Sequence, residues 1–418
     1  MDTARPLKVC LDARFADIGH CVGVRTTVAG LASALAELDG DEQYFFLAFQ
    51  DSHEWLRPFL RNGCRILPVT RRPPPRWRGF VKRLPGVAEL YEQVAPWISQ
   101  AQVGPSDGTL EREGIEVMHF TAQGGFLTDI PTIFAPQDLQ HLHLPELFTP
   151  RTHHEREVVY RTLCQQAAAV TVMSTQSKQD LVQHFGLPAD KIAVIPLAPA
   201  NAFAAESALP EQDIVRQKYA LPSQFAFFPA ETWEHKNHIG LLEALAIVRS
   251  SRQTNIPLVC TGHPTEFFAT VMKRVRELKL TDQVRFLGFL PASEIQCLYR
   301  MSRCLIFPTR FEGWGLPLTE AFYARVPAVC SNISPLKEQA AGAALFFDPR
   351  NPESIAQALW KVWTDEPLRQ RLVRAGAERL KLFSWDHTAR LFRALYRKLG
   401  NRLLTEEDRA LLASPPLT

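Results

Sequence analysis

Short apolar runs alternate with amphipathic stretches along most of the chain. The apolar runs are LKVCLDARF, QYFFLAF, CRILPV, EVMHF, PTIFAPQ, AVTVMS and KIAVIPL in the first half, and FAFFPAE, PLVCTG, VRFLGF, CLIFPT, PAVCSNI and ALFFDP in the second. Most are continuous rather than alternating, which is typical of strands covered on both faces. Helical patterns of roughly 10 to 15 residues separate them, as in βα units. The pattern predicts an α/β fold with parallel sheets.

An Ala/Pro-rich stretch after Pro196, APANAFAAESALPEQD, interrupts this pattern and indicates a linker. We therefore expect two Rossmann-like, doubly wound domains that face each other across a cleft, over residues 1–200 and 201–385. Apolar positions recur at helical spacing from Pro352 to Leu399. A helical tail over residues 386–418 is expected to pack back toward the first domain. Helices of the second domain are predicted near Ile239–Val248, Glu266–Leu280, Ala292–Met301 and Leu318–Ala324.

Composition narrows the class of protein. A chain of 418 residues with 46% hydrophobic content can bury a large core, and a net charge of +3 does not by itself argue for nucleic acid. The eight cysteines stand singly without a CxxC pair, so buried free thiols are expected rather than disulfides or zinc. The first residues lack the apolar stretch of a signal peptide, and no later run is long enough to span a bilayer. These features predict a cytoplasmic protein.

The segment FEGWGLPLTE, residues 311–320, follows a buried-type strand and opens a predicted helix. Ligands bind at this position in open α/β sheets. Gly313 and Gly315 allow the backbone to approach a ligand, and Pro317 at the first helical position leaves N–H groups directed outward, as an anion requires. Glu320, expected in the first helical turn, and Glu312 can reach one crevice, where one carboxylate takes sugar hydroxyls and the other a ribose diol.

A purely structural interpretation also fits these residues, because acidic side chains in a first helical turn and glycine-rich turns occur for stability alone. The rest of the sequence favours a ligand-binding role for these residues over a purely structural one. E-G-x-G-L-P-x-x-E resembles the glutamate-x7-glutamate motif of retaining glycosyltransferases of family 4, which have two Rossmann-like domains (the GT-B fold). Other segments from Phe225 to about Trp363 resemble the same family: FFPAETWEHKNHIGLLEAL, LVCTG, VRFLGFLPASEIQCLYRMSRCLIFPT and SNISPLKEQAAGAALFFDPRNPESIAQAL.

The resemblance implies roles for individual residues of the second domain. Lys236 matches the lysine that neutralises the leaving β-phosphate, and Glu312 and Glu320 match the residues that contact the donor sugar and the ribose. Donor contacts are also implied for Gly262, Phe289, Gly313, Trp314, Gly315 and Leu316. The arginine that often accompanies the lysine is not evident, so His235 or His238 either replaces it or forms local hydrogen bonds only.

The first domain resembles the family in fewer places. DARFADIGHCVGVRTTVAGLASAL resembles its first strand, glycine loop and helix, with Gly23 at the position that approaches the diphosphate. In FAPQDLQHLHLPELF, Gln137 stands where many relatives have a histidine; it cannot transfer a proton but can hydrogen-bond a sugar hydroxyl. Asp138, His141 and His143 either face the acceptor, one as a base, or hold the loop together, the structural role being favoured for the histidines. The family's phosphate binding implies no metal and no cofactor.

Two further segments carry clusters of charged residues. LDGDEQ, around Asp39–Asp41, resembles a metal-binding Asp-x-Asp but reads as a polar turn. Arg71–Gly86, RRPPPRWRGFVKRLPG, is either a solvated loop or a contact with anionic membrane or a lipid-linked acceptor at the inner face of a membrane. No recognised nucleic-acid motif accompanies it, so no nucleic-acid partner is expected.

The sequence thus predicts a metal-independent, retaining hexosyltransferase that uses a nucleoside diphosphate sugar and a glycan or lipid-linked glycan hydroxyl. PAETWEHKNH and DLQHLHLPELF resemble mannosyltransferases and related hexosyltransferases, which favours GDP-mannose as donor. A catalytically silent sugar-nucleotide-binding or scaffold protein, a nucleotide-sugar epimerase and a phosphorylase of the same architecture remain alternatives.

Overall fold

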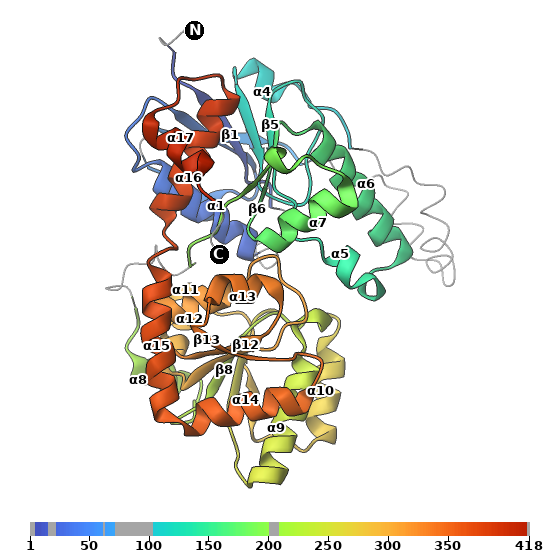
Figure 1. Cartoon of the computed structure of the whole chain (residues 1–418), viewed down its shortest axis with the longest axis vertical. Coiled ribbons are helices and arrows are strands. Elements are labelled where there is room, and N and C mark those ends of the chain that lie inside the picture. The colour runs from blue at the N-terminus through green and yellow to red at the C-terminus, as the bar shows by residue number, and fades with distance from the viewer. Residues whose placement is uncertain (1–4, 16–21, 62, 72–102, 200–208, 416–418) are drawn as a thin grey trace. The chain divides into compact units, whose positions relative to one another are not determined.

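A computed structural model describes residues 5–15, 22–61, 63–71, 103–199 and 209–415 (Figure 1). The chain divides into two compact units. The first contains the described residues of Met1–Ile195 and Asp386–Pro416, and the second those of Pro196–Trp385. Each unit is built around one sheet with parallel strand pairs, as the continuous apolar runs predict.

The first unit holds a seven-stranded sheet in the order β3-β2-β1-β4-β5-β6-β7. Its strands are β1 (Lys8–Asp12), β2 (Gln43–Phe49), β3 (Cys64–Val69), β4 (Val117–Phe120), β5 (Thr132–Phe134), β6 (Ala169–Val172) and β7 (Ile192–Val194). Its helices are α1 (Val22–Leu35), α4 (Thr109–Arg112), α5 (Gln140–His143), α6 (Pro150–Gln166), α7 (Thr175–Phe185), α16 (Trp385–Leu399) and α17 (Glu406–Ala413).

The second unit holds a six-stranded sheet in the order β10-β9-β8-β11-β12-β13. Its strands are β8 (Ala226–Pro229), β9 (Leu258–Thr261), β10 (Val284–Phe286), β11 (Cys304–Phe307), β12 (Ala328–Ser331) and β13 (Ala344–Phe347). Its helices are α8 (Gln212–Lys218), α9 (His238–Arg252), α10 (Phe268–Glu277), α11 (Ala292–Met301), α12 (Leu316–Tyr323), α13 (Ser334–Ala340), α14 (Pro352–Thr364) and α15 (Glu366–Leu380). In both sheets the chain starts in the middle and builds outward on each side, so the order reverses between β1 and β4 and between β8 and β11.

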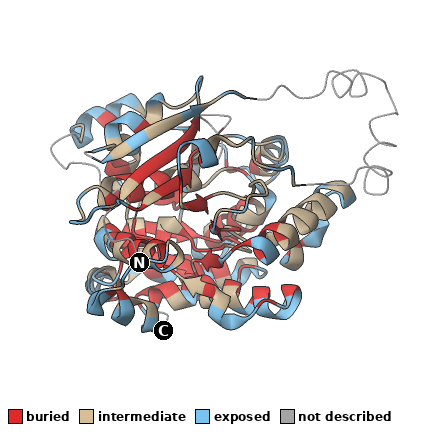
Figure 2. Ribbon diagram, turned by 90° about the horizontal axis from the view of Figure 1, so that it is seen from above, coloured by how far each residue is buried: buried red, intermediate tan, exposed pale blue. Residues whose placement is uncertain are grey.

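Each apolar run quoted above contains one of the strands β1–β13. Figure 2 shows why most runs are continuous: most strand residues are buried, whereas the helices keep exposed outer surfaces. The edge strand β3 is the exception, with no buried residue. The predicted helix Ala292–Met301 has the observed bounds, and the helical spacing from Pro352 to Leu399 corresponds to α14, α15 and α16. Helix α17 also lies within the predicted tail, and Thr405 and Asp408 form a capping box at its start.

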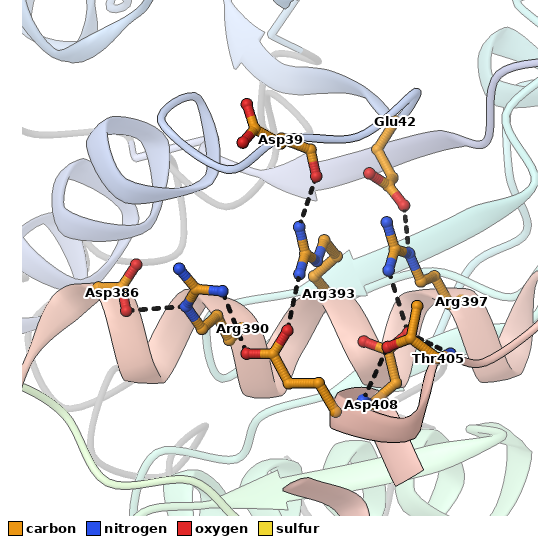
Figure 3. A network of polar contacts seen from close by, with 9 residues as sticks. Asp39, Glu42, Asp386, Arg390, Arg393, Arg397, Thr405 and Asp408 are labelled. Atoms are coloured by element: carbon orange, nitrogen blue, oxygen red, sulfur yellow. Dashed lines mark hydrogen bonds and ion pairs between the residues drawn. The ribbon is translucent and has the colours of Figure 1, made fainter. Parts of the chain in front are cut away.

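The polar turn at Asp39–Asp41 is a docking point for α16 (Figure 3). Arg393 donates to the Asp39 carbonyl at 2.8 Å, and Arg397 bonds Glu42 Oε1 at 2.5 Å and Asp408 Oδ2 at 3.0 Å. The Glu42 side chain is only 4% exposed. These contacts attach α16 and α17 to the first unit.

The seven cysteines among the described residues all carry free thiols, and six of them are buried. Cys21 lies outside the described residues. Within the described ranges, no helix combines the length and apolar character needed to cross a bilayer. Apart from Arg71, the basic segment Arg71–Gly86 also lies outside the described residues.

Candidate functional site

Two loops meet at the carboxyl edge of the second sheet, where the strand order reverses. The loop after β8 carries Lys236 at the end of a short 3-10 helix, Glu234–Lys236, and the loop after β11 carries Glu312. Lys236 Nζ lies 2.6 Å from Glu312 Oε1, and the two side chains are 19% and 11% exposed. Such a reversal creates a crevice between neighbouring loops, where ligands bind in open α/β sheets. The structure thus brings together two predicted site residues.

Asn237 fixes the loop that carries Lys236. Its φ of 63° lies in the left-handed region, which asparagine tolerates better than most residues. Its Nδ2 donates to the carbonyls of Pro308 at 3.0 Å and Pro349 at 2.8 Å, and its Oδ1 accepts from the Gly240 amide, which caps α9. One side chain therefore joins the ends of three structural elements beside the lysine.

The glycine-rich loop requires glycine at Gly315. Its φ is 101°, and a Cβ there would lie 2.5 Å from Leu336 Cδ2. Leu316 begins α12, so Pro317 is its second residue rather than its first. The amides at the start of this helix lie beside Glu312 in the chain and form the positive end of the helix dipole. Leu316 lies at this positive end, and Gly313 lies in the loop that leads into it.

Trp314 lies in this loop, but its indole points into the unit. The side chain is buried, Nε1 donates to the Leu197 carbonyl at 3.2 Å, and the ring packs edge-on against Phe383. The predicted donor contact of Trp314 is therefore limited to its backbone. The tryptophan anchors the loop to the core.

Glu320 is the fifth residue of α12, so the expectation that it lies in the first turn is wrong. It is half-buried, and its Oε2 accepts a hydrogen bond from the Tyr299 hydroxyl at 2.8 Å. Burial raises the pKa of Glu320 to about 7, and the bond from Tyr299 opposes this shift. The carboxylate therefore changes charge close to neutral pH. Tyr299 carried no signal in the sequence.

Neighbouring loops add a glycine and an exposed aromatic surface. Gly262 follows β9 with a φ of 125°, and a Cβ there would lie 2.6 Å from the Ala230 backbone. Phe289 is 50% exposed and stacks on His263, with ring centroids 4.5 Å apart. These residues lie at the carboxyl edge of the same sheet, as expected for donor-binding residues.

His238 does not supply the second cation considered above. It is buried in α9, with its ring 4.5 Å from that of Phe228. Burial lowers the pKa of His238 to about 3, so it is neutral. Glu231, five residues before the lysine, accepts from Trp233 Nε1 at 2.6 Å. Of the two histidines, His235 alone remains a candidate.

In the first unit, Gln137 and Asp138 follow β5. Gln137 has a φ of 69° and donates from Nε2 to the Thr121 carbonyl at 2.6 Å. Asp138 accepts bonds at both oxygens, from Arg156 at 3.1 Å and from Gln123 at 2.9 Å. The contacts show Asp138 holding this region together.

His141 and His143 are each bound to a carboxylate. His141 is fully buried and bonds Glu157 of α6 at 3.1 Å, and burial lowers its pKa. His143 bonds Asp180 of α7 at 2.7 Å, which raises its pKa. These contacts agree with the structural role. The described residues contain no cluster of three or more His, Cys, Asp or Glu side chains that could hold a metal.

Gly23, the predicted diphosphate contact of the first unit, is exposed at the second position of α1. A Cβ there would meet nothing within 4 Å, and its carbonyl accepts from Thr27 Oγ1 at 3.1 Å. The glycine loop before it, residues 16–21, lies outside the described residues.

Both halves of the chain match glycosyltransferase families. Residues 211–379 match the model for glycosyl transferases group 1, and residues 22–198 match the glycosyl transferase 4-like domain. Together with the two parallel-sheet units, these matches place the chain in the GT-B glycosyltransferases. Several of its relatives are named mannosyltransferases.

Two relatives and one solved structure illustrate this similarity. O-antigen chain mannosyltransferase B of Escherichia coli is 28% identical over 269 residues, which cover 62% of this chain and 70% of that protein. The serotype-specific mannosyltransferase WbdA of Escherichia coli is 27% identical over 231 residues, 54% of this chain but only 28% of WbdA. A crystal structure of HepE from Anabaena in complex with UDP and glucose has a TM-score of 0.68 at 14% identity and covers 94% of this chain and all of that one. The last supports the fold alone.

Proposed function

We propose that the protein is a retaining hexosyltransferase that moves mannose from GDP-mannose to a hydroxyl of a glycan or lipid-linked glycan. The observation that carries the proposal is the contact between Lys236 and Glu312 at the strand-order reversal of the second sheet. The choice of mannose and of a glycan acceptor draws on relatives that are named as O-antigen and serotype-specific mannosyltransferases.

The proposed reaction breaks the bond between the anomeric carbon and the donor phosphate oxygen and forms a bond to the acceptor oxygen. The departing diphosphate takes up the proton of the acceptor hydroxyl. Negative charge grows on the diphosphate, where Lys236 and the amides at the start of α12 stabilise it. Glu312 exchanges its bond to Lys236 for hydroxyls of the donor sugar, and Glu320 takes the ribose. Lysine and helix dipole supply the charge stabilisation, so the proposed reaction requires no metal and no cofactor.

We propose that the acceptor binds to the first unit, where Gln137 hydrogen-bonds a sugar hydroxyl without transferring a proton. A cytoplasmic location at the inner face of a membrane is part of the proposal, because a lipid-linked acceptor would be presented there. The basic and aromatic residues of Arg71–Gly86 suit contact with anionic headgroups.

A calorimetric screen of GDP-, UDP-, ADP- and dTDP-sugars tests the donor site. One donor should bind, and Lys236→Ala and Glu320→Ala should each weaken it at least tenfold, since each removes a charge-assisted contact. Lys361→Ala, which removes an exposed lysine of α14, is the matched control and should bind like wild type. Binding of no donor by the folded protein would refute the proposal and favour the silent scaffold.

A further inference from the structure

The buried side chain of Tyr299 contacts the carboxylate of Glu320, the predicted ribose-binding residue. Tyr299 lies on α11 with no exposed surface, and its ring packs edge-on against Phe227 of β8, with centroids 4.9 Å apart. Its hydroxyl lies 2.8 Å from Glu320 Oε2 and 3.3 Å from the Pro317 carbonyl. The core thus fixes the ring of Tyr299, and its hydroxyl contacts two residues of α12.

The hydroxyl has one proton and two possible acceptors. The carboxylate is the nearer, and a bond to a charged oxygen is roughly twice as strong as one to a neutral oxygen. Tyr299 therefore donates to Glu320 when the carboxylate is ionised. The bond occupies Oε2 and leaves Oε1 of the half-buried side chain for another partner.

We propose that Tyr299 is a positioning residue that holds one oxygen of Glu320 so that the other faces the ribose diol of the donor nucleotide. This inference rests on the proposed function, from which it takes its ligand. The free oxygen has two lone pairs, which can accept both hydroxyls of a diol. A glutamate held at one oxygen also loses less side-chain freedom on binding than a free one.

The bond also bears on the charge of Glu320. Its pKa stands at about 7 through burial, with Tyr299 as the group that lowers it. Tyr299 is the titratable side chain that faces Glu320 from α11. Within the described chain, charged groups on the elements packed against α12, namely β11, β12, α13 and α15, add nothing to the shift. Loss of the hydroxyl should therefore move the titration of Glu320 to higher pH.

The variant Tyr299→Phe tests this inference, because it keeps the ring and removes only the hydroxyl. In protein labelled with ¹³C at the glutamate carboxyls, the Glu320 resonance, assigned from Glu320→Gln, should titrate at higher pH than in wild type. Donor affinity at pH 7 should fall about tenfold, and the loss should shrink as the pH rises and the carboxylate ionises.

The chain contains a matched control. The Tyr219 hydroxyl donates to Glu294 Oε2 at 2.5 Å in the same unit, so Tyr219→Phe removes the same kind of bond between α11 and the end of α8. This variant should bind donor like wild type. The double variant Tyr299→Phe, Glu320→Gln should bind donor no more weakly than Glu320→Gln alone, since Tyr299 acts through Glu320.

The outcomes separate this inference from the proposed function. If wild type binds a donor and Tyr299→Phe matches it in affinity and in the titration of Glu320, the positioning role is refuted and the donor site stands. If Tyr299→Phe weakens binding equally in the Glu320→Gln background, Tyr299 acts on packing and the inference fails. If wild type binds no donor, the proposed function fails, and this inference fails with it.

Discussion

Replacing Glu320 by glutamine should stabilise the second unit at alkaline pH. Glutamine has nearly the same shape, and its amide oxygen can still accept the Tyr299 hydrogen bond. The substitution removes the charge that burial disfavours. It should also weaken donor binding, so stability and function change in opposite directions.

The size of this stabilisation follows from the pKa of Glu320, which is about 7 in the folded protein and 4.5 for an ordinary glutamate. The folded state holds its proton more tightly than the unfolded state, so wild type loses stability as the pH rises from 4.5 through 7. Each pKa unit corresponds to about 1.4 kcal/mol, so ionised Glu320 costs about 3 kcal/mol at pH 8. At pH 5 the cost is about 1 kcal/mol or less.

Hydrogen exchange measured by mass spectrometry gives the opening free energy of α12 itself, so the two units do not have to unfold together. Wild type and Glu320→Gln are compared at pH 5 and at pH 8, because intrinsic exchange rates cancel between variants at one pH. The advantage of the variant should grow by about 2 to 3 kcal/mol between these two values. Glu266→Gln, at an exposed glutamate of the same unit, is the control.

Equal stability of wild type and Glu320→Gln at pH 8 would show that the carboxylate is well solvated. A stability difference that does not change with pH would attribute the effect to packing instead of charge. Either result would refute the burial argument. A matching pH-dependent gain in Glu266→Gln would mean that the effect is general and unrelated to the position of Glu320.

Three further predictions concern the supports of the site and of the first unit. Gly315→Ala should lower the unfolding free energy by about 3 kcal/mol, because alanine disfavours the positive φ and its Cβ would overlap a leucine methyl. Chemical denaturation measures this loss of stability. Arg397→Met leaves two buried carboxylates without their cation and should cost about 3 kcal/mol or more, read as a lower melting temperature. Trp314→Phe loses a buried hydrogen bond and should cost about 1 kcal/mol, while calorimetry finds donor affinity within about twofold of wild type.

Other residues of the chain provide controls for these substitutions. Gly342 has a φ of 90° but open space around a Cβ, so Gly342→Ala should lower the unfolding free energy by only about 1 kcal/mol. If Gly315→Ala and Gly342→Ala lose the same stability, overlap with the leucine methyl does not contribute at Gly315. Arg390 pairs with exposed carboxylates of Asp386 and Glu407, so Arg390→Met should cost less than about 1 kcal/mol. A cost as large as that of Arg397→Met would contradict the role of burial. A sharp loss of donor affinity in Trp314→Phe would place the indole in the site.

The helices, the strands and the glutamate-x7-glutamate motif can be read from the sequence alone. Continuous apolar runs bounded by polar turns mark strands buried on both faces, and each run contains one strand. The glycine-rich turn from Glu312 to Glu320 and the lysine in HKNH are local features that the printed letters already show. Periodicity and turn chemistry act over a few residues, so the chain can be read for them without its fold.

Which of these features come into contact depends on the folded arrangement of the chain. Lys236 and Glu312 are 76 residues apart in the chain and touch because β8 and β11 are neighbours in the sheet. Trp314 looks like a site residue in the sequence, yet its indole turns inward to meet Leu197 and Phe383. Tyr299 carried no signal because its role depends on a single contact with the next helix. Strand order and burial arise from contacts between remote segments, and no local pattern encodes them.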